Sequence, residues 1–135
     1  MISLTKKKIL IVCNSTFAYK HFLTNLVGEL KSLNNDIYLL VGKDNQNKSI
    51  NFENKKNLFF TEMPKRNLIN IYSFIKTIKN IINIIKKIDV DIVISNNRDA
   101  SFCTRLGMFF LSKKKIKNVY FARGFYFHDG QNIFK

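Results

Sequence analysis

Two kinds of apolar pattern alternate along the chain. Continuous apolar runs of about five residues are typical of strands that are buried on both faces. Apolar residues that recur every three or four positions are typical of helices with one buried face. The runs predict strands at 9–13, 37–41, 58–60, 90–94 and 119–122, and the spaced segments predict helices at 17–33, 68–88 and 99–111.

The two later helices have predicted inner faces. Because isoleucine is only a moderate helix former, packing rather than propensity should hold the helix at 68–88. Its apolar face consists of Ile71, Phe74, Ile75, Ile78, Ile81, Ile82, Ile85 and Ile88, and its polar face of Ser73, Lys76, Thr77, Asn80, Asn83 and Lys87. In the helix at 99–111, the residues expected to point inward are Phe102, Leu106, Phe109 and Phe110.

The order of these elements predicts an α/β fold, a Rossmann-like parallel sheet of about five strands flanked by helices. We expect the strand order 3-2-1-4-5. In such sheets ligands bind outside the carboxyl ends of the strands, near the switch point between the first and fourth strands. The candidate site therefore lies in the loops at 14–17, 42–46, 62–67, 95–99 and 122–130.

The length of the chain limits the number of domains, but its charge leaves the kind of partner open. The chain has 135 residues, which suits one domain over residues 1–135. Its 23 Lys and Arg against 9 Asp and Glu give a net charge of +14. This charge indicates either a polyanionic partner or a coding bias that also enriches Asn and Ile. The basic runs at 6–8 and 113–115 precede strands, so both lie at the edge opposite the candidate site.

Several site chemistries have no motif in the chain. The loop Asn14-Ser15-Thr16-Phe17 contains no glycine, so the dinucleotide fingerprint and the P-loop are both missing after the first strand. No Gly-x-Ser-x-Gly elbow occurs. The few cysteines and histidines show no metal-ligand spacing, so we expect no metal and no cofactor. Cys13 and Cys103 lie in apolar stretches and indicate free, buried thiols of a reducing compartment.

Two loops carry the candidate side chains. In the loop 95–99, Asn96 and Arg98 would bond sugar hydroxyls or a phosphate, or the loop only caps the following helix through Asp99. In the loop 122–130, three aromatic residues either fold back under the last helix or form a carbohydrate or lipid platform. For His21 and Arg66, a site role and an ordinary surface role both stay open.

Three segments together resemble a known family. They are 8–15, the Pro64-Lys65-Arg66 element at 63–68, and the region that joins 89–95, Arg105-Leu106-Gly107 and 122–127. In this order and spacing they resemble the N-terminal, acceptor-binding domain of a family-four glycosyltransferase with the GT-B architecture. The nearest resemblance is to bacterial enzymes that build capsule, O-antigen or lipid-linked oligosaccharides.

The resemblance implies that this domain binds the acceptor, while a C-terminal domain binds the nucleotide-sugar and catalysis occurs between them without a metal. Many relatives carry His-Gly where this chain has Arg123-Gly124, so no catalytic residue is assigned. Relatives are more than twice as long, so we expect a truncated domain, with the donor-binding domain absent and no turnover by the chain alone. The residues expected to line the cleft are Asn14, Ser15, Arg66, Asn96, Arg98, Arg123, Gly124 and Tyr126.

Other functions stay open beside this one. The segment Met63–Ile88 contains six Lys or Arg and no acidic residue, which favours a membrane-associated, non-catalytic partner of a split glycosyltransferase. A nucleotide-sugar epimerase of the same architecture is a further alternative. A nucleic-acid-binding domain rests on charge alone, and without a recognised motif we expect no nucleic-acid partner.

We expect the chain in the cytoplasm, with peripheral contact to the inner face of the cell membrane as an option. The apolar run at 9–13 is too short for the core of a signal peptide. No apolar run approaches the roughly 18 residues of a membrane span.

Overall fold

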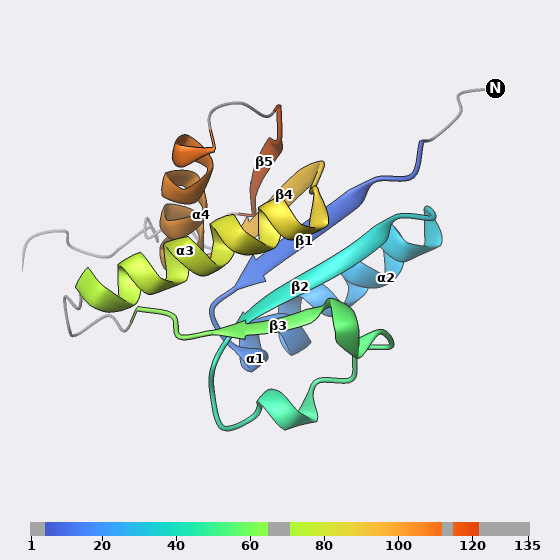
Figure 1. The fold of residues 1–135 in the computed structure, drawn as a ribbon. Helices are drawn as coiled ribbons and strands as arrows, with labels where there is room; N and C mark the ends of the chain where they lie inside the picture. Colours follow the sequence, from blue (N-terminus) through green and yellow to red (C-terminus); the bar gives the residue numbers. More distant parts are fainter. Residues whose placement is uncertain (1–4, 65–70, 112–114, 122–135) are drawn as a thin grey trace, which may run out of the picture.

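Five parallel strands form one sheet in the computed structural model, in the order β3-β2-β1-β4-β5 (Figure 1). The structure describes residues 5–64, 71–111 and 115–121. Ile11 of the central strand pairs with Leu39 on one side and Ile94 on the other. The predicted Rossmann-like sheet and its strand order are therefore confirmed. The strands are β1 (Lys8–Cys13), β2 (Asp36–Gly42), β3 (Leu58–Thr61), β4 (Ile92–Asn96) and β5 (Lys117–Phe121).

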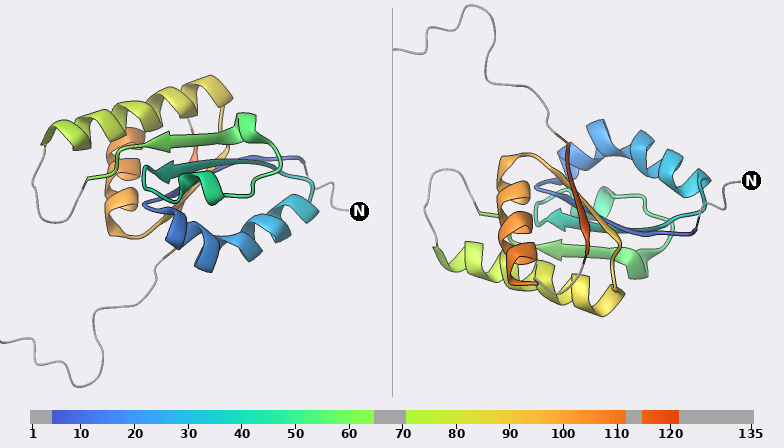
Figure 2. Two further views of the ribbon diagram at one scale, coloured as in Figure 1. Left: turned by 90° about the horizontal axis from the view of Figure 1, so that it is seen from below. Right: turned by 90° about the horizontal axis from the view of Figure 1, so that it is seen from above.

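Helices cover both faces of the sheet (Figure 2). The predicted helix at 17–33 is observed as three consecutive pieces, in which a π-helical turn separates two α-helical segments. None of the helices within the described residues has the length and apolar content needed to cross a bilayer. The helices are α1 (Thr16–Ala18), the π-turn η1 (Tyr19–Leu23), α2 (Thr24–Ser32), the 3-10 turns η2 (Asn47–Ser49) and η3 (Lys55–Asn57), α3 (Ile71–Ile88) and α4 (Arg98–Phe110).

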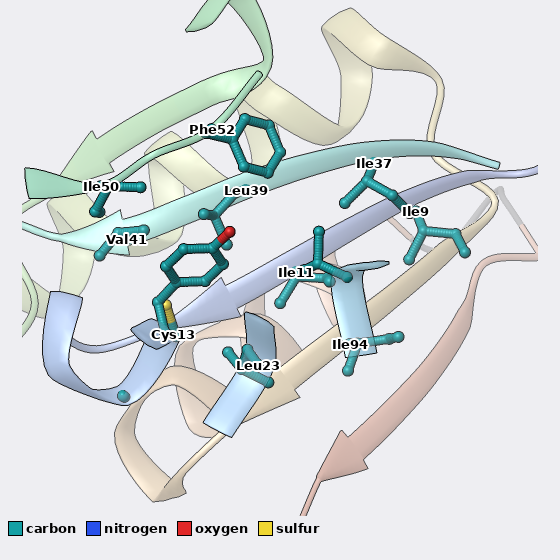
Figure 3. Packing of buried hydrophobic residues seen from close by; sticks show 13 residues of the cluster. Ile9, Ile11, Cys13, Leu23, Ile37, Leu39, Val41, Ile50, Phe52 and Ile94 are labelled. Carbon is teal, nitrogen blue, oxygen red and sulfur yellow. The ribbon is translucent and has the colours of Figure 1, made fainter. Parts of the chain in front are cut away.

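The continuous apolar runs are explained by two buried clusters, one on each face of the sheet. Along β1, Ile9 and Ile11 pack toward α1 and α2, and Leu10 and Val12 pack toward α3 and α4. Each alternate side chain is thus buried in a different layer, as expected for a strand that is covered on both faces. Figure 3 shows the first cluster, which includes Ile9, Ile11, Cys13, Leu23, Ile37, Leu39, Val41, Ile50, Phe52 and Ile94.

The fourth strand begins two residues later than predicted. Val90 is fully buried, but it lies in the turn before the strand. The Asp91 N–H donates to the Lys8 carbonyl at 2.9 Å, and the regular ladder starts at Ile92. The apolar run therefore predicts the burial of Val90 correctly, but it predicts the start of the strand two residues too early.

The buried face of α3 also differs from the prediction. The predicted polar residue Thr77 is fully buried, whereas Ile71 and Ile75 are exposed. Thr77 donates its hydroxyl to the Glu62 carbonyl, and Asn80 Nδ2 donates to Thr61 Oγ1 at 2.8 Å. Thr77 and Asn80 thus face the core side because the polar atoms at the end of β3 need hydrogen-bond partners. The first turns of α3 extend past the edge of the sheet (Figure 2), so no strand that the structure describes lies beneath Ile71 and Ile75.

The prediction for α4 was wrong about the inward aromatic residues. Phe102, Phe109 and Phe110 are exposed, and the buried face consists of small residues. A Cβ at Gly107 would lie 3.5 Å from Ile81 Cγ2 and from Ile82 Cγ1, so α4 approaches α3 too closely for large side chains. The buried residues of α4 are Ala100, Ser101, Cys103, Thr104 and Gly107.

Both cysteines are buried thiols that form no disulfide, as predicted. Burial raises the pKa of the Cys103 thiol to about 11, and the negative charge of Asp99 adds to this effect. The Cys103 side chain therefore stays a neutral thiol at physiological pH and belongs to the core.

Candidate functional site

A hollow of about 490 Å³ opens at the carboxyl ends of the strands. Residues that follow β1, β2, β3 and β4 meet there, as expected for the switch point of a doubly wound sheet. We call it the carboxyl-edge hollow, and its lining residues are Asn14, Lys43, Met63, Pro64, Asn97, Arg98 and Asp99.

Gly42 allows the strand ends at this edge to approach one another. A Cβ at this position would collide with the Asn14 carbonyl oxygen and would lie 2.9 Å from Met63 Cγ. The next residue, Lys43, donates its N–H to the Thr61 carbonyl at 2.8 Å. The ends of β1, β2 and β3 therefore converge because residue 42 has no side chain.

Asp44 joins the loops that follow β1 and β2. Its carboxylate accepts hydrogen bonds from the Thr16 N–H at 2.7 Å and from the Thr16 hydroxyl at 2.8 Å. Asn47 Nδ2 donates to Thr16 Oγ1 at 3.0 Å and to the Gly42 carbonyl at 3.1 Å. Burial raises the pKa of Asp44, but the hydrogen bonds from Thr16, Gln46 and Asn47 outweigh it, so the net pKa is lowered.

The Asp44 carboxylate stands at the start of the helical segment after β1. In dinucleotide-binding folds a phosphate occupies the corresponding place, where helix N–H groups are available. Here the Thr16 N–H already bonds a carboxylate of the chain itself. This geometry agrees with the missing glycine-rich loop. Sequence reasoning missed Asp44, because its partner Thr16 lies 28 positions away.

The first turn of α4 forms another wall of the hollow. Asn97 caps this helix, with its side-chain oxygen accepting from the Ala100 N–H at 3.2 Å. The backbone of Asn97 has φ 69° and ψ 168°, a conformation that residues other than glycine rarely adopt. The strained residue thus lies directly at the hollow.

Asn96 and Ser15, both predicted for the site, have other positions. Asn96 ends β4, is fully buried and does not line the hollow. The Ser15 hydroxyl accepts from the Ala18 N–H at 3.1 Å and so caps α1. Successive residues of a strand point to opposite sides, so a shift of one position exchanges the predicted Asn96 for the lining residue Asn97.

Two cations of the hollow come from different segments, Arg98 from the first turn of α4 and Lys43 from the loop after β2. Arg98 is exposed, and its Nε lies 3.4 Å from the Asp99 carboxylate. Lys43, which sequence reasoning missed, is exposed on the loop after β2. With the amide groups of Asn14 and Asn97, these side chains suit a ligand that carries both hydroxyl groups and negative charge.

Four predicted site residues lie outside the described residues, namely Arg66, Arg123, Gly124 and Tyr126. The aromatic loop at 122–130 also lies there. These assignments stay predictions. His21 is exposed on η1, where its ring packs against Phe17 with a centroid distance of 4.1 Å. Among the described residues, no group of three or more His, Cys, Asp and Glu could hold a metal ion.

In comparisons with known sequences, no family model and no curated protein matches the chain. Comparisons with solved structures do find matches. A glycosyltransferase from Rickettsia africae ESF-5 aligns with a TM-score of 0.66 and 21% identity, over 93% of this chain and 32% of that one.

Two other solved structures are similar over much of the chain. A UDP-N-acetylglucosamine 2-epimerase aligns with a TM-score of 0.62 and 20% identity, over 85% of this chain and 33% of that one. MurG from Acinetobacter baumannii aligns with a TM-score of 0.61 and 14% identity, over 84% and 33%.

These likenesses concern the fold. The chain is a Rossmann-like domain of the kind that occurs in GT-B glycosyltransferases and in related sugar enzymes. It spans 32–33% of the length of the solved structures named above.

Proposed function

We propose that the chain is the acceptor-binding half of a glycosyltransferase that transfers a sugar from a nucleotide-sugar to a polysaccharide or lipid-linked acceptor. The observation that carries this proposal is the carboxyl-edge hollow, in which two cations and two amide side chains meet at the switch point of a GT-B-like sheet. The family-four membership, with capsule, O-antigen or lipid-linked products, is part of the proposal.

The chemistry of the lining supports an acceptor with a phosphate group. Lys43 and Arg98 would hold the phosphate of a lipid carrier through charge-assisted hydrogen bonds. The amides of Asn14 and Asn97 can both donate to and accept from sugar hydroxyls. Arg66, Arg123 and Tyr126, expected to line the same cleft, would complete the acceptor site, while a second domain or chain would bind the nucleotide-sugar.

Calorimetric titration of the 135-residue chain with a short-chain polyprenyl-diphosphate sugar tests this proposal. We expect binding, and we expect Arg98→Ala to weaken it about tenfold to a hundredfold, since a hydrogen bond to a charged group contributes roughly 1.5–3 kcal/mol. Lys86→Ala is the matched control, because Lys86 is an exposed lysine in the last turn of α3 and does not line the hollow. Unchanged binding by Arg98→Ala, or equal binding of UDP-N-acetylglucosamine, would contradict the acceptor assignment.

A second candidate function, the membrane-associated partner subunit, is favoured by the first turns of α3. Ile71 and Tyr72 are 66% and 71% exposed, and Ile75 is exposed one turn further on. Lys79 continues the same helix face at four-residue spacing, so apolar and basic side chains stand together. Such a face suits the surface of an anionic bilayer.

Vesicle flotation distinguishes this second candidate. We expect the chain to float with vesicles of phosphatidylcholine and phosphatidylglycerol at low salt, and not with phosphatidylcholine alone. Ile75→Asp should abolish flotation, whereas Leu33→Asp, at an exposed apolar residue on another helix end, should leave it unchanged. Equal flotation of both variants would remove the α3 surface from consideration.

A further inference from the structure

The two asparagine side chains of the carboxyl-edge hollow use their oxygen atoms within the chain. Asn97 Oδ1 accepts from the Ala100 N–H at 3.2 Å, and Asn14 Oδ1 accepts from the Ser15 hydroxyl at 3.3 Å. The Ser15 hydroxyl itself accepts from the Ala18 N–H at 3.1 Å, so its one hydrogen is available for Asn14. Because an NH2 group could not accept these bonds, the orientation of both amides is fixed. Neither Nδ2 atom bonds a residue that the structure describes.

The unused hydrogen-bonding capacity of the hollow therefore belongs mainly to donors. The two Nδ2 atoms carry two N–H groups each, and Lys43 Nζ carries three. Lys43 forms no ion pair with any residue in the described part of the chain. Arg98 adds its guanidinium, whose Nε lies 3.4 Å from the Asp99 carboxylate. Asp99 is the one acidic residue among the described lining residues, so donors outnumber acceptors.

Such a set of donors suits an oxyanion better than a neutral sugar. The oxygens of an ionised phosphate accept hydrogen bonds, and those from cationic side chains are the stronger, charge-assisted kind. A sugar hydroxyl could accept from the same N–H groups, but its own hydrogen would then need an acceptor. Met63 and Pro64 add an apolar part to the lining. There the first carbon atoms of an apolar alcohol would lose contact with water.

We propose that the carboxyl-edge hollow binds the phosphate end of the acceptor, a phosphate or diphosphate ester of an apolar alcohol, and that the acceptor sugar lies outside the hollow. Nδ2 of Asn14 and of Asn97 donate to phosphate oxygens beside Lys43 and Arg98. This assignment rests on the proposed function and narrows it, since the two amides then recognise negative charge rather than sugar hydroxyls.

The backbone of Asn97 provides a way to separate binding from folding. Its φ of 69° and ψ of 168° belong to a region that glycine adopts far more readily than other residues. Glycine is also a helix N-cap only slightly weaker than asparagine. Asn97→Gly therefore removes the amide from the hollow, relieves the backbone and leaves the helix start intact.

Calorimetric titration of the 135-residue chain tests the proposal with inorganic pyrophosphate and with a short-chain polyprenyl diphosphate, with and without its sugar. We expect all three to bind, both polyprenyl diphosphates more tightly than pyrophosphate and with similar affinity to each other. Asn97→Gly should weaken binding of all three about tenfold to a hundredfold, because it removes a hydrogen bond to a charged group. Asn34→Gly is the matched control. Asn34 also has a positive φ, 64°, but it follows α2 and does not line the hollow, so its binding should be unchanged.

A change of charge at the same side chain gives a second measurement. Asn97→Asp keeps an oxygen for the Ala100 N–H and replaces the NH2 group with a negatively charged oxygen, so binding of pyrophosphate should be lost. Asn54→Asp is the control for this variant. Asn54 caps η3 in the same way, accepting from the Lys56 N–H at 3.2 Å, and does not line the hollow.

The probes distinguish the phosphate assignment from the acceptor role. Loss of binding when the sugar is removed, or unchanged pyrophosphate binding by Asn97→Gly, would overturn the phosphate assignment and leave the proposed function standing. Binding of pyrophosphate through Asn97, with no tighter binding of either polyprenyl diphosphate, would support a phosphate site and contradict the acceptor role. Absence of binding by all three probes would overturn both.

Discussion

At the scale of single residues, the candidate site depends on groups that the sequence shows only in part. Asn14 and Arg98 were predicted from the loops that follow strands, and the structure brings both to the carboxyl-edge hollow. Lys43 and Asn97 lie in the loops 42–46 and 95–99 that were predicted for the site, but neither residue was singled out. The sequence shows which loop residues are polar. It does not show which of them line the same hollow, because that depends on where the neighbouring strands end.

Gly42 provides the sharpest test of this packing. Gly42→Ala places a methyl group against the backbone of Asn14, and backbone cannot move aside as cheaply as a flexible side chain. We expect the free energy of unfolding in urea to fall by about 1–3 kcal/mol, the usual cost of overpacking.

Gly28→Ala is the matched control. It lies in α2, and apart from its chain neighbours and the nearby backbone of the same helix, no atom lies within 4 Å of the added Cβ. Because alanine favours helix over glycine, we expect this variant to be more stable by up to about 1 kcal/mol. Equal stability of the two variants would mean that the strand ends are not tightly packed at residue 42.

Asp44 should make stability depend on acid pH. Its pKa is lowered in the folded chain, so the carboxylate adds stability above its unfolded pKa of about 3.9, and this stability is lost as pH falls through the lower folded pKa. Asp44→Asn should therefore be less stable than the wild type at neutral pH. The difference in unfolding free energy should shrink as the pH falls from about 4 downward.

Urea unfolding at several pH values measures this effect. Glu53→Gln serves as the control, because the Glu53 side chain is 88% exposed and its contact with Lys31 spans 3.6 Å. An exposed pair of this kind contributes little to stability. A wild-type advantage over Asp44→Asn that persisted unchanged at low pH would contradict the role of the carboxylate.

At the scale of elements, periodicity predicted which segments are helices and strands but not always which side faces the core. In α4 the aromatic residues Phe102 and Phe109 are exposed, because the space beside α3 admits only small side chains. In α3 the buried Thr77 donates its hydroxyl to the Glu62 carbonyl, just after the end of β3. Both differences arise from the partner surface, which local sequence does not describe.

Two substitutions at Gly107 test the close contact of α4 with α3. A Cβ there would make ordinary contacts at 3.5 Å, so Gly107→Ala should gain up to about 1 kcal/mol of unfolding free energy from helix propensity. Gly107→Leu should lose about 1–3 kcal/mol, because its longer side chain must displace Ile81 or Ile82. Thermal and urea unfolding measure both. Similar stability of the two variants would show that this helix face is not closely packed.

At the scale of the whole molecule, the chain has the sheet of a GT-B-like domain, but the proposed sugar transfer needs more than this domain. The sheet is of the kind found in GT-B glycosyltransferases, yet the chain spans only 32% of the Rickettsia enzyme that it resembles. The acceptor-binding role assigns the nucleotide-sugar to a second domain or chain. Under the proposed function, the hollow would bind an acceptor without performing the transfer.

The isolated chain should accordingly show no sugar transfer. The measurement is product formation from a radiolabelled nucleotide-sugar and a lipid-linked acceptor, with and without a separately supplied donor-binding domain. Transfer by the chain alone would contradict the division of roles. Binding of the acceptor, measured separately, would still be required by the proposed function.

The sequence by itself determined the fold class, the strand order and the edge of the sheet where the hollow opens. These features follow from apolar runs, helical spacing and the handedness of crossovers, all of which are local or topological. Only the tertiary structure decided that Asp44 bonds Thr16, that Gly42 meets Asn14, and which faces of α3 and α4 are buried. The physical reason is that these contacts join segments far apart in the chain, and their partners exist only after the sheet has formed.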